Sequence, residues 1–157
     1  GGEDAEAVII GALDNPDVAW TAVSSLRNMG TPTARAALIQ AAESADDPQV
    51  RAAALQELPN LGTDDAQRIL TDALLDSNTD IRYGATSALE GSGSTQAAQA
   101  IADALRSGTL SDDEAMPLAQ ALERMGGEVA KANAALLEDL LPAPVDTGMP
   151  VEPIDIP

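Results

Sequence analysis

A segment that recurs every 31 to 33 residues is the feature that most constrains the fold of this chain. Three stretches align, and each has a β-branched residue followed at four-residue intervals by Ala, Leu and Gly. They span residues 15–30, 47–62 and 78–93. Their closing glycines, with a fourth at Gly126, are 32, 31 and 33 residues apart. Such a period predicts an array of small units, each burying its apolar face against its neighbours.

Each unit is predicted to be a hairpin of two antiparallel helices, each about three turns long. Apolar residues at four-residue intervals form one stripe along the first helix. The residues that precede these stripes suit helix N-caps; they are Asn15, Asp47, Asn78 and Ser111. The closing glycine suits the left-handed position after a helix. Thr31, Thr63 and Ser94 then suit the N-cap of a second helix.

The unit boundaries divide the chain into an array over residues 1–141 and a tail over 142–157. The array is predicted to contain a half repeat at 3–14 and units at 15–46, 47–77, 78–110 and 111–141. The fourth unit is the weakest match, because it has Glu114 at the β-branched position and Pro117 inside its first helix. Its last helix is expected to run from 128 to 141.

Residues 3–14 are interpreted as the second helix of a preceding unit. The segment is either cut from a larger protein or the N-terminal cap of the array, and the first interpretation is favoured because Val8, Ile9 and Ile10 do not give it the polar outer face of a capping unit. Such an open end would bind upstream repeats, a partner or a second copy of the chain.

The tail contains five prolines and has no helical period, so an extended conformation is expected. Two interpretations stay open. The tail is a linker to further sequence, or it is a docking strand whose apolar anchors are Val151, Ile154 and Ile156.

The motif D-P-x-V-R-x-x-A-x-x-x-L-x-x-L-G, at residues 47–62, resembles a HEAT-like repeat of the short bacterial type also seen in phycobilin lyases. The resemblance spans roughly residues 3–141. It implies an all-α fold, a right-handed α-solenoid of about four hairpins used chiefly for protein–protein contact. It also implies that Asp80 bridges neighbouring units through Arg51 or Arg82.

Composition excludes several function classes. The chain has no Cys and no His, so disulfides, thiolate zinc sites and catalysis by a thiol or an imidazole are excluded. Its 26 acidic and 8 basic residues give a net charge of −18, which argues against binding nucleic acid or anionic lipid. The longest apolar runs, such as residues 7–10, are only four residues long and too short to insert into a membrane. The acidity hints at a periplasmic, secreted or high-salt setting.

No cofactor motif is present, and one candidate metal motif is incomplete. Residues 76–80 read D-x-N-x-D, as in a calcium loop, but Ile81 and Ser87 stand where the loop needs Gly and Glu. We interpret this segment as an Asx-rich turn with a helix cap and predict no metal and no cofactor.

Charged residues on the second helices form the first candidate binding surface. Asp72 and Asp103 occupy equivalent repeat positions and are expected to stack as an acidic ladder. Arg68, Asp76 and Arg106 accompany them. The ladder is either a groove for a cationic segment or a solvated acidic face.

Trp20 and Tyr83 are the second candidate surface. They share one repeat position, with Ala52 as the equivalent between them, and lie two residues after the β-branched position. That spacing directs them away from the core. They are either anchors for a partner or side chains that pack on a neighbouring element.

These features are consistent with three functions. The favoured one is a non-catalytic protein-interaction scaffold, a fragment of a larger protein that docks a basic or apolar segment of a protein partner on its acidic groove or exposed end. The alternatives are an enzyme-like chromophore lyase or chaperone of the phycobilin-lyase type and a self-association module that forms homo-oligomers.

Overall fold

The computed structural model describes residues 2–142, and all their regular structure is helical. The elements are α1 (Gly2–Gly11), η1 (Ala12–Asp14), α2 (Pro16–Met29), α3 (Pro32–Ser44), α4 (Pro48–Glu57), η2 (Leu58–Leu61), α5 (Asp64–Ala73), α6 (Thr79–Ser92), α7 (Thr95–Arg106), α8 (Asp112–Met125), α9 (Gly127–Ala132) and α10 (Ala134–Leu140). η1 and η2 are short 3-10 turns.

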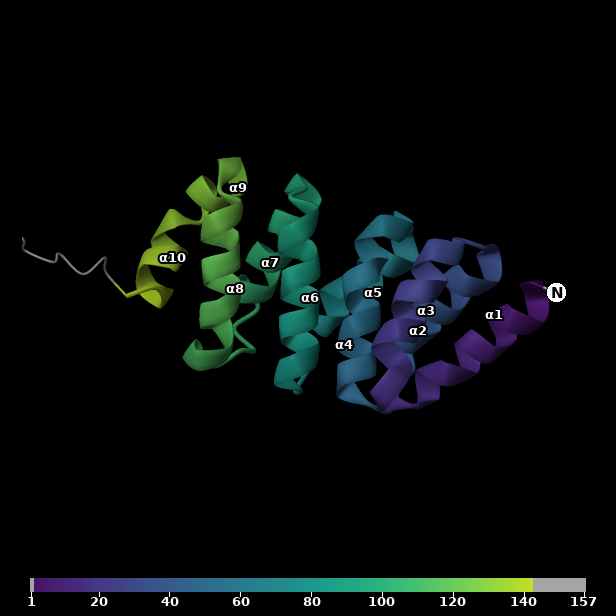
Figure 1. The fold of residues 1–157 in the computed structure, drawn as a ribbon. Helices are drawn as coiled ribbons and strands as arrows, with labels where there is room; N and C mark the ends of the chain where they lie inside the picture. The colour runs from purple at the N-terminus through teal and green to yellow at the C-terminus, as the bar shows by residue number, and fades with distance from the viewer. Residues whose placement is uncertain (1, 143–157) are drawn as a thin grey trace, which may run out of the picture.

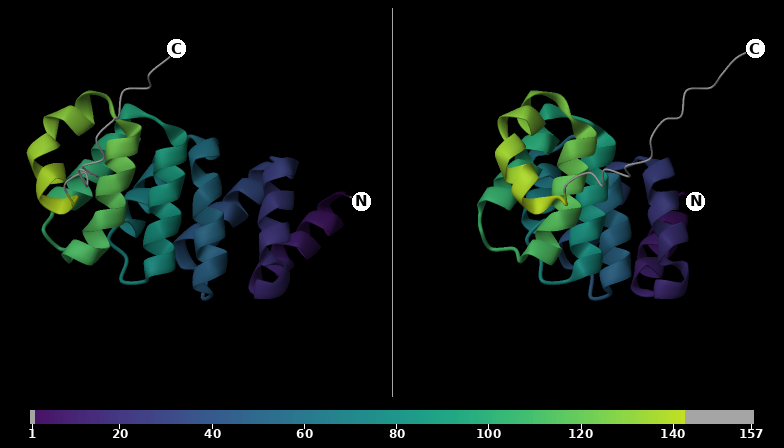
Figure 2. Two further views of the ribbon diagram at one scale, coloured as in Figure 1. Left: turned by 60° about the vertical axis from the view of Figure 1, so that its left-hand side comes forward. Right: turned by 90° about the vertical axis from the view of Figure 1, so that its left-hand side faces the viewer.

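The helices stack as a solenoid, as predicted. The first helices of the hairpins, α2, α4, α6 and α8, each pack on the next (Figure 1). The second helices α3, α5, α7 and α9 form a parallel row. The two ends of the described chain lie at opposite ends of this array (Figure 2). The all-α solenoid predicted from the repeat is therefore confirmed.

Capping side chains begin the helices where the sequence places them. Asp47 accepts hydrogen bonds from the backbone N–H groups of Gln49 and Val50 at 2.8 and 3.2 Å. Thr31 caps α3 by accepting from the N–H of Ala34 at 3.0 Å. Asn15, Thr63, Asn78 and Ser94 cap α2, α5, α6 and α7 in the same way. At α8, Ser111 and Glu114 form a capping box, in which the Glu114 carboxylate accepts from the N–H of Ser111 at 3.0 Å.

The closing glycines end α2, η2 and α6 in the expected conformation. Gly30, Gly62 and Gly93 have φ of 61°, 61° and 60°. This left-handed conformation is costly for a residue with a side chain, which explains why glycine recurs at this position. Gly126 also has a positive φ, but its ψ of −145° leads the chain directly into α9.

The core is one continuous seam between the two rows of helices. The repeated leucines of α2, η2, α6 and α8 are fully buried; they are Leu26, Leu58, Leu89 and Leu122. The second helices contribute Leu38, Leu70 and Ile101 at equivalent positions. Small alanines fill most of the remaining seam, so the helices approach closely.

The single helix expected over 128–141 is wrong, because the chain breaks into α9 and α10 at Asn133. The Asn133 amide donates to the carbonyl of Val129 at 2.7 Å, and its oxygen accepts from Arg106 at 2.8 Å. The side chain therefore competes with the regular backbone pattern and binds the preceding unit at the same time.

The half repeat at the start of the chain forms α1 and η1. α1 packs against α2 and α3 at an angle to both (Figure 1). Its buried Glu6 accepts a hydrogen bond from the hydroxyl of Thr31, which joins α1 to the start of α3. Val8 is 73% exposed.

Two further points concern membranes and the tail. None of the helices in residues 2–142 has the length and apolar character needed to cross a bilayer. Val151, Ile154 and Ile156 lie outside the described residues, so the docking-strand interpretation of the tail stays a prediction.

Candidate functional site

The only two aromatic residues of the chain line the same groove. Trp20 on α2 is 60% exposed and Tyr83 on α6 is 65% exposed, and the groove between them crosses α4. We call it the aromatic groove; it is lined by Trp20, Gln49, Ala52, Ala53, Gln56, Asp80, Tyr83 and Gly84. The side chains therefore face away from the core, as the repeat position predicted, and they share one surface.

Small residues form the floor of the aromatic groove. Ala52 and Ala53 of α4 lie between the helices that carry the two aromatic rings. Gly84 of α6 packs directly against Ala52, so the neighbouring helices approach without an intervening side chain. A large residue at position 52 would fill this space, so the alanine of the middle unit is what opens the groove.

Polar groups stand at the rim of the aromatic groove. Gln49 and Gln56 of α4 provide amides that can both donate and accept hydrogen bonds. The backbone N–H of Asp80 donates to the side chain of Asn78, but its carboxylate has no hydrogen-bond or ion-pair partner among residues 2–142. The groove therefore combines apolar walls with one free negative charge.

The charged residues of the second helices are already engaged with one another. Arg68 of α5 donates to Glu43 of α3 at 3.0 Å and to Asp72 at 3.4 Å. The hydrogen bond to Glu43 raises the pKa of Arg68 above its ordinary value. Arg68 therefore bridges two units and offsets part of the charge of Asp72.

Asp103 is engaged in the same manner on α7. It accepts hydrogen bonds from Arg106 and, at 2.9 Å, from Gln99, and the first of these lowers its pKa. Arg106 also reaches Asn133 of the next unit. This face thus holds paired charges, and the acidic groove proposed for Asp72 and Asp103 stays a prediction.

Asp76 takes the bridging role that the resemblance implied for Asp80. Arg51 of α4 forms an ion pair with the Asp76 carboxylate at 3.2 Å and donates to the carbonyl of Ala42 at 3.1 Å. The expected bridge through Asp80 is wrong, because Asp76 lies in the loop between the units whereas Asp80 faces the aromatic groove.

Arg82 holds the third and fourth units together. It donates to the carbonyl of Asp76 at 2.7 Å and pairs with Glu114 of α8 at 3.2 Å. Its side chain is only 8% exposed. Arg51 and Arg82, which share one repeat position, are therefore structural residues of the unit interfaces.

The segment 76–80 forms the Asx turn that the sequence favoured. The carboxylate of Asp76 accepts from the N–H of Asn78 at 2.8 Å, and Asn78 in turn caps α6. Within residues 2–142, no three or more acidic side chains gather in a way that could hold a metal ion.

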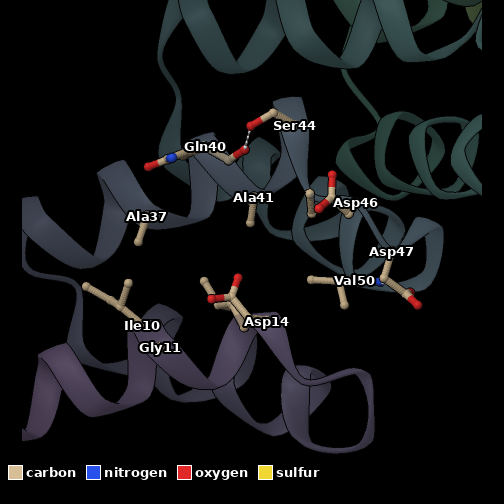
Figure 3. Close-up of a pocket in the computed structure, with 12 residues that line it drawn as sticks. Ile10, Gly11, Asp14, Ala37, Gln40, Ala41, Ser44, Asp46, Asp47 and Val50 are labelled. Carbon is tan, nitrogen blue, oxygen red and sulfur yellow. Dashed lines mark hydrogen bonds between the residues drawn. The ribbon is translucent and has the colours of Figure 1, made fainter.

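A larger pocket lies between helix α3 and the N-terminal segment formed by α1 and η1 (Figure 3). We call it the N-terminal pocket; its cavity volume is about 600 Å³. Leu13, Ala41 and Val50 are among its buried apolar residues, and Asp14, Asp46 and Asp47 stand around it. Sequence reasoning named the exposed N-terminal end but missed this pocket, because the pocket depends on the angle between α1 and α3.

Comparison with known families supports the repeat. A family model of HEAT repeats matches residues 1–56 and 35–123. No curated protein matches the chain. The resemblance read from the motif at 47–62 is confirmed over residues 1–123, and most of the divergent fourth unit lies beyond the match.

Proposed function

Because the chain belongs to the HEAT-repeat family, whose members generally serve as protein-interaction scaffolds, we propose that it is a non-catalytic scaffold that docks a protein partner on the aromatic groove. One observation carries the proposal. Trp20 and Tyr83 come from units two apart in the array, yet both are more than half exposed and line the same groove.

The physical argument rests on what such side chains contribute at interfaces. Trp and Tyr bury a large rigid area at little cost in side-chain entropy and dominate the binding energy of many interfaces. The sequence contains no other aromatic residue, so no second pair of aromatic anchors exists. An exposed aromatic pair of this kind indicates a surface that is covered in a complex.

The spacing of the helices indicates the form of the partner. Adjacent packed helices lie about 8–10 Å apart, so α2 and α6 are separated by about 16–20 Å across α4. An extended chain covers this span in about five or six residues at roughly 3.3 Å each. The favoured ligand is therefore an extended segment with two apolar residues at that separation and one basic residue that pairs with Asp80.

Selection from a random peptide display library tests the proposal. Peptides selected on the wild-type protein should lose at least about tenfold in affinity with either Trp20→Ala or Tyr83→Ala, as measured by calorimetry. Leu75→Ala is the matched control, because Leu75 is an exposed apolar residue outside the groove. The proposal would be overturned if no selected peptide lost affinity in both aromatic variants.

The lyase alternative gains no support from this surface. Among residues 2–142, Asp80 is the only carboxylate that lines the aromatic groove, so these residues do not supply the pair of groups that acid–base catalysis needs.

A further inference from the structure

We propose that the N-terminal pocket binds an aliphatic side chain carried by a basic segment of a partner protein. This second docking surface involves α1, η1 and α3 and shares no residue with the aromatic groove. Because the two surfaces share no residue, this inference can be tested separately from the function proposed for Trp20 and Tyr83.

The interior of the pocket fits an apolar side chain. Leu13, Ala41 and Val50 are at most 9% exposed, and the half-buried Ile10 of α1 points toward Ala37 and Ala41 of α3 (Figure 3). A cavity of about 600 Å³ is within the range of sites that bind small ligands and side chains. Burial of a leucine-sized group there is favourable because it removes apolar surface from water on both sides.

The rim of the pocket is negative, and no basic side chain of the described residues lines it. The carboxylates of Asp14 and Asp46 have no hydrogen-bond or ion-pair partner among residues 2–142. Asp47 is engaged as the N-cap of α4. Arg51, which follows the pocket residue Val50, is directed instead at Ala42 and Asp76. Asp14 and Asp46 therefore have no cationic partner among residues 2–142, and a basic side chain of a ligand would supply one.

Backbone dipoles reinforce this charge. The last turn of α3, which contains Ala41 and Ser44, lies at the pocket. The carboxyl end of a helix carries partial negative charge and favours cations. The positive N-terminal end of α4, which follows in the chain, is already neutralised by the carboxylate of Asp47.

The chain itself is a poor source of the cation. Seven of its eight basic residues form ion pairs within the array, namely Arg27, Arg51, Arg68, Arg82, Arg106, Arg124 and Lys131. A second copy would bring another net charge of −18. Residues 143–157 contain three acidic residues and no Lys or Arg. Charge complementarity therefore favours a basic partner segment over residues 1–157 themselves or a second copy of them.

A short probe peptide with lysines on both sides of one central leucine tests the inference by calorimetry. Wild-type protein should bind it about tenfold more tightly than a peptide with serine in place of the leucine, because only the leucine fills the apolar interior. Asp14→Asn combined with Asp46→Asn should weaken binding about tenfold. Neither carboxylate holds a neighbour in place within residues 2–142, so this variant should fold normally.

The matched control separates local recognition from general attraction to an acidic protein. Asp72→Asn combined with Asp103→Asn removes the same charge from the second-helix face and should change the affinity less than about twofold. Ala37→Leu, at the edge of the pocket, should block the leucine peptide by filling the cavity. Leu75→Ala, which lies outside both surfaces, should leave probe binding unchanged.

Four results would overturn the inference. They are no measurable binding of the leucine probe, equal binding of the leucine and serine probes, equal loss in the two paired Asp→Asn variants, and a concentration-dependent dimer that Ala37→Leu abolishes. The last result would assign the pocket to a second copy of the chain. None of these results bears on the aromatic groove, which is tested by its own variants.

Discussion

Gly84 of α6 lies against Ala52 of α4 so closely that a Cβ atom built on Gly84 would stand 3.0 Å from both the Cα and the Cβ of Ala52. This contact lies where the second and third hairpins meet, between the helices that carry the floor and one wall of the aromatic groove. A side chain at position 84 would push α6 away from α4, because the backbone of α4 cannot rotate aside. The close approach therefore sets both the packing of the units and the shape of the groove.

Alanine at position 84 should destabilise the protein relative to alanine at position 91 of the same helix. Both changes gain helix propensity, worth up to about 1 kcal/mol, but only Gly84→Ala overpacks the interface, which costs about 1–3 kcal/mol. A Cβ at Gly91 would meet no atom within 4 Å. Urea unfolding should therefore show Gly91→Ala as the more stable variant by about 1–3 kcal/mol. Equal stabilities would contradict the close packing of α4 and α6.

Loss of Arg82 should destabilise the array far more than loss of Arg124. Arg82→Met removes a buried guanidinium that joins the loop carbonyl of Asp76 to Glu114 of the next unit, and should cost about 2–3 kcal/mol. Arg124 pairs with Glu90 in an exposed setting, so Arg124→Met should lie close to wild type. Thermal unfolding of both variants is the measurement. Similar losses of stability in the two variants would show that Arg82 does not hold the units together.

Acid should weaken the start of α8 through Glu114. Hydrogen bonds from the backbone N–H and hydroxyl of Ser111, with the charge of Arg82, lower the pKa of Glu114 below its ordinary value. The ionised form is thus favoured in the folded state, so its stabilisation is present above the unfolded pKa of about 4.3 and is lost as the pH falls through the folded pKa.

The measurement is the urea midpoint at a series of pH values from neutral to acid. In Glu114→Gln the midpoint should fall less steeply below about pH 4.3 than in the wild type, because the glutamine cannot lose a charge. The amide oxygen can still accept from the N–H of Ser111, so the cap itself is retained in this variant. Parallel curves for the two proteins would show that Glu114 contributes no pH dependence.

Local features of the fold could be predicted from the sequence because they depend on neighbouring residues alone. Asp47 and Thr31 cap their helices through N–H groups two or three positions away. Gly62 adopts its positive φ because the turn between the two helices of its own hairpin requires a left-handed residue. The spacing of the leucines predicts which residues form the buried seam between the two rows of helices, because every unit buries the same face.

The features that were missed depend on how units sit against one another. Asn133 ends α9 partly because Arg106, 27 residues earlier, donates to its side chain. The repeat register places Trp20 and Tyr83 on one face, but their shared groove also requires the close approach of Gly84 to Ala52. The N-terminal pocket depends on the tilt of α1 against α3. The spacing of residues along the sequence does not determine how neighbouring units are oriented against one another.

The separation of positions 20 and 83 tests the central claim most directly. The chain has no cysteine, so Trp20→Cys combined with Tyr83→Cys gives two unique sites for spin labels and a dipolar distance measurement. Stacked units predict one narrow distribution near the span of two helix spacings, about 16–20 Å before the label linkers are added. A broad distribution, or one centred beyond about twice that span, would mean that the two positions do not flank one groove and would contradict the account.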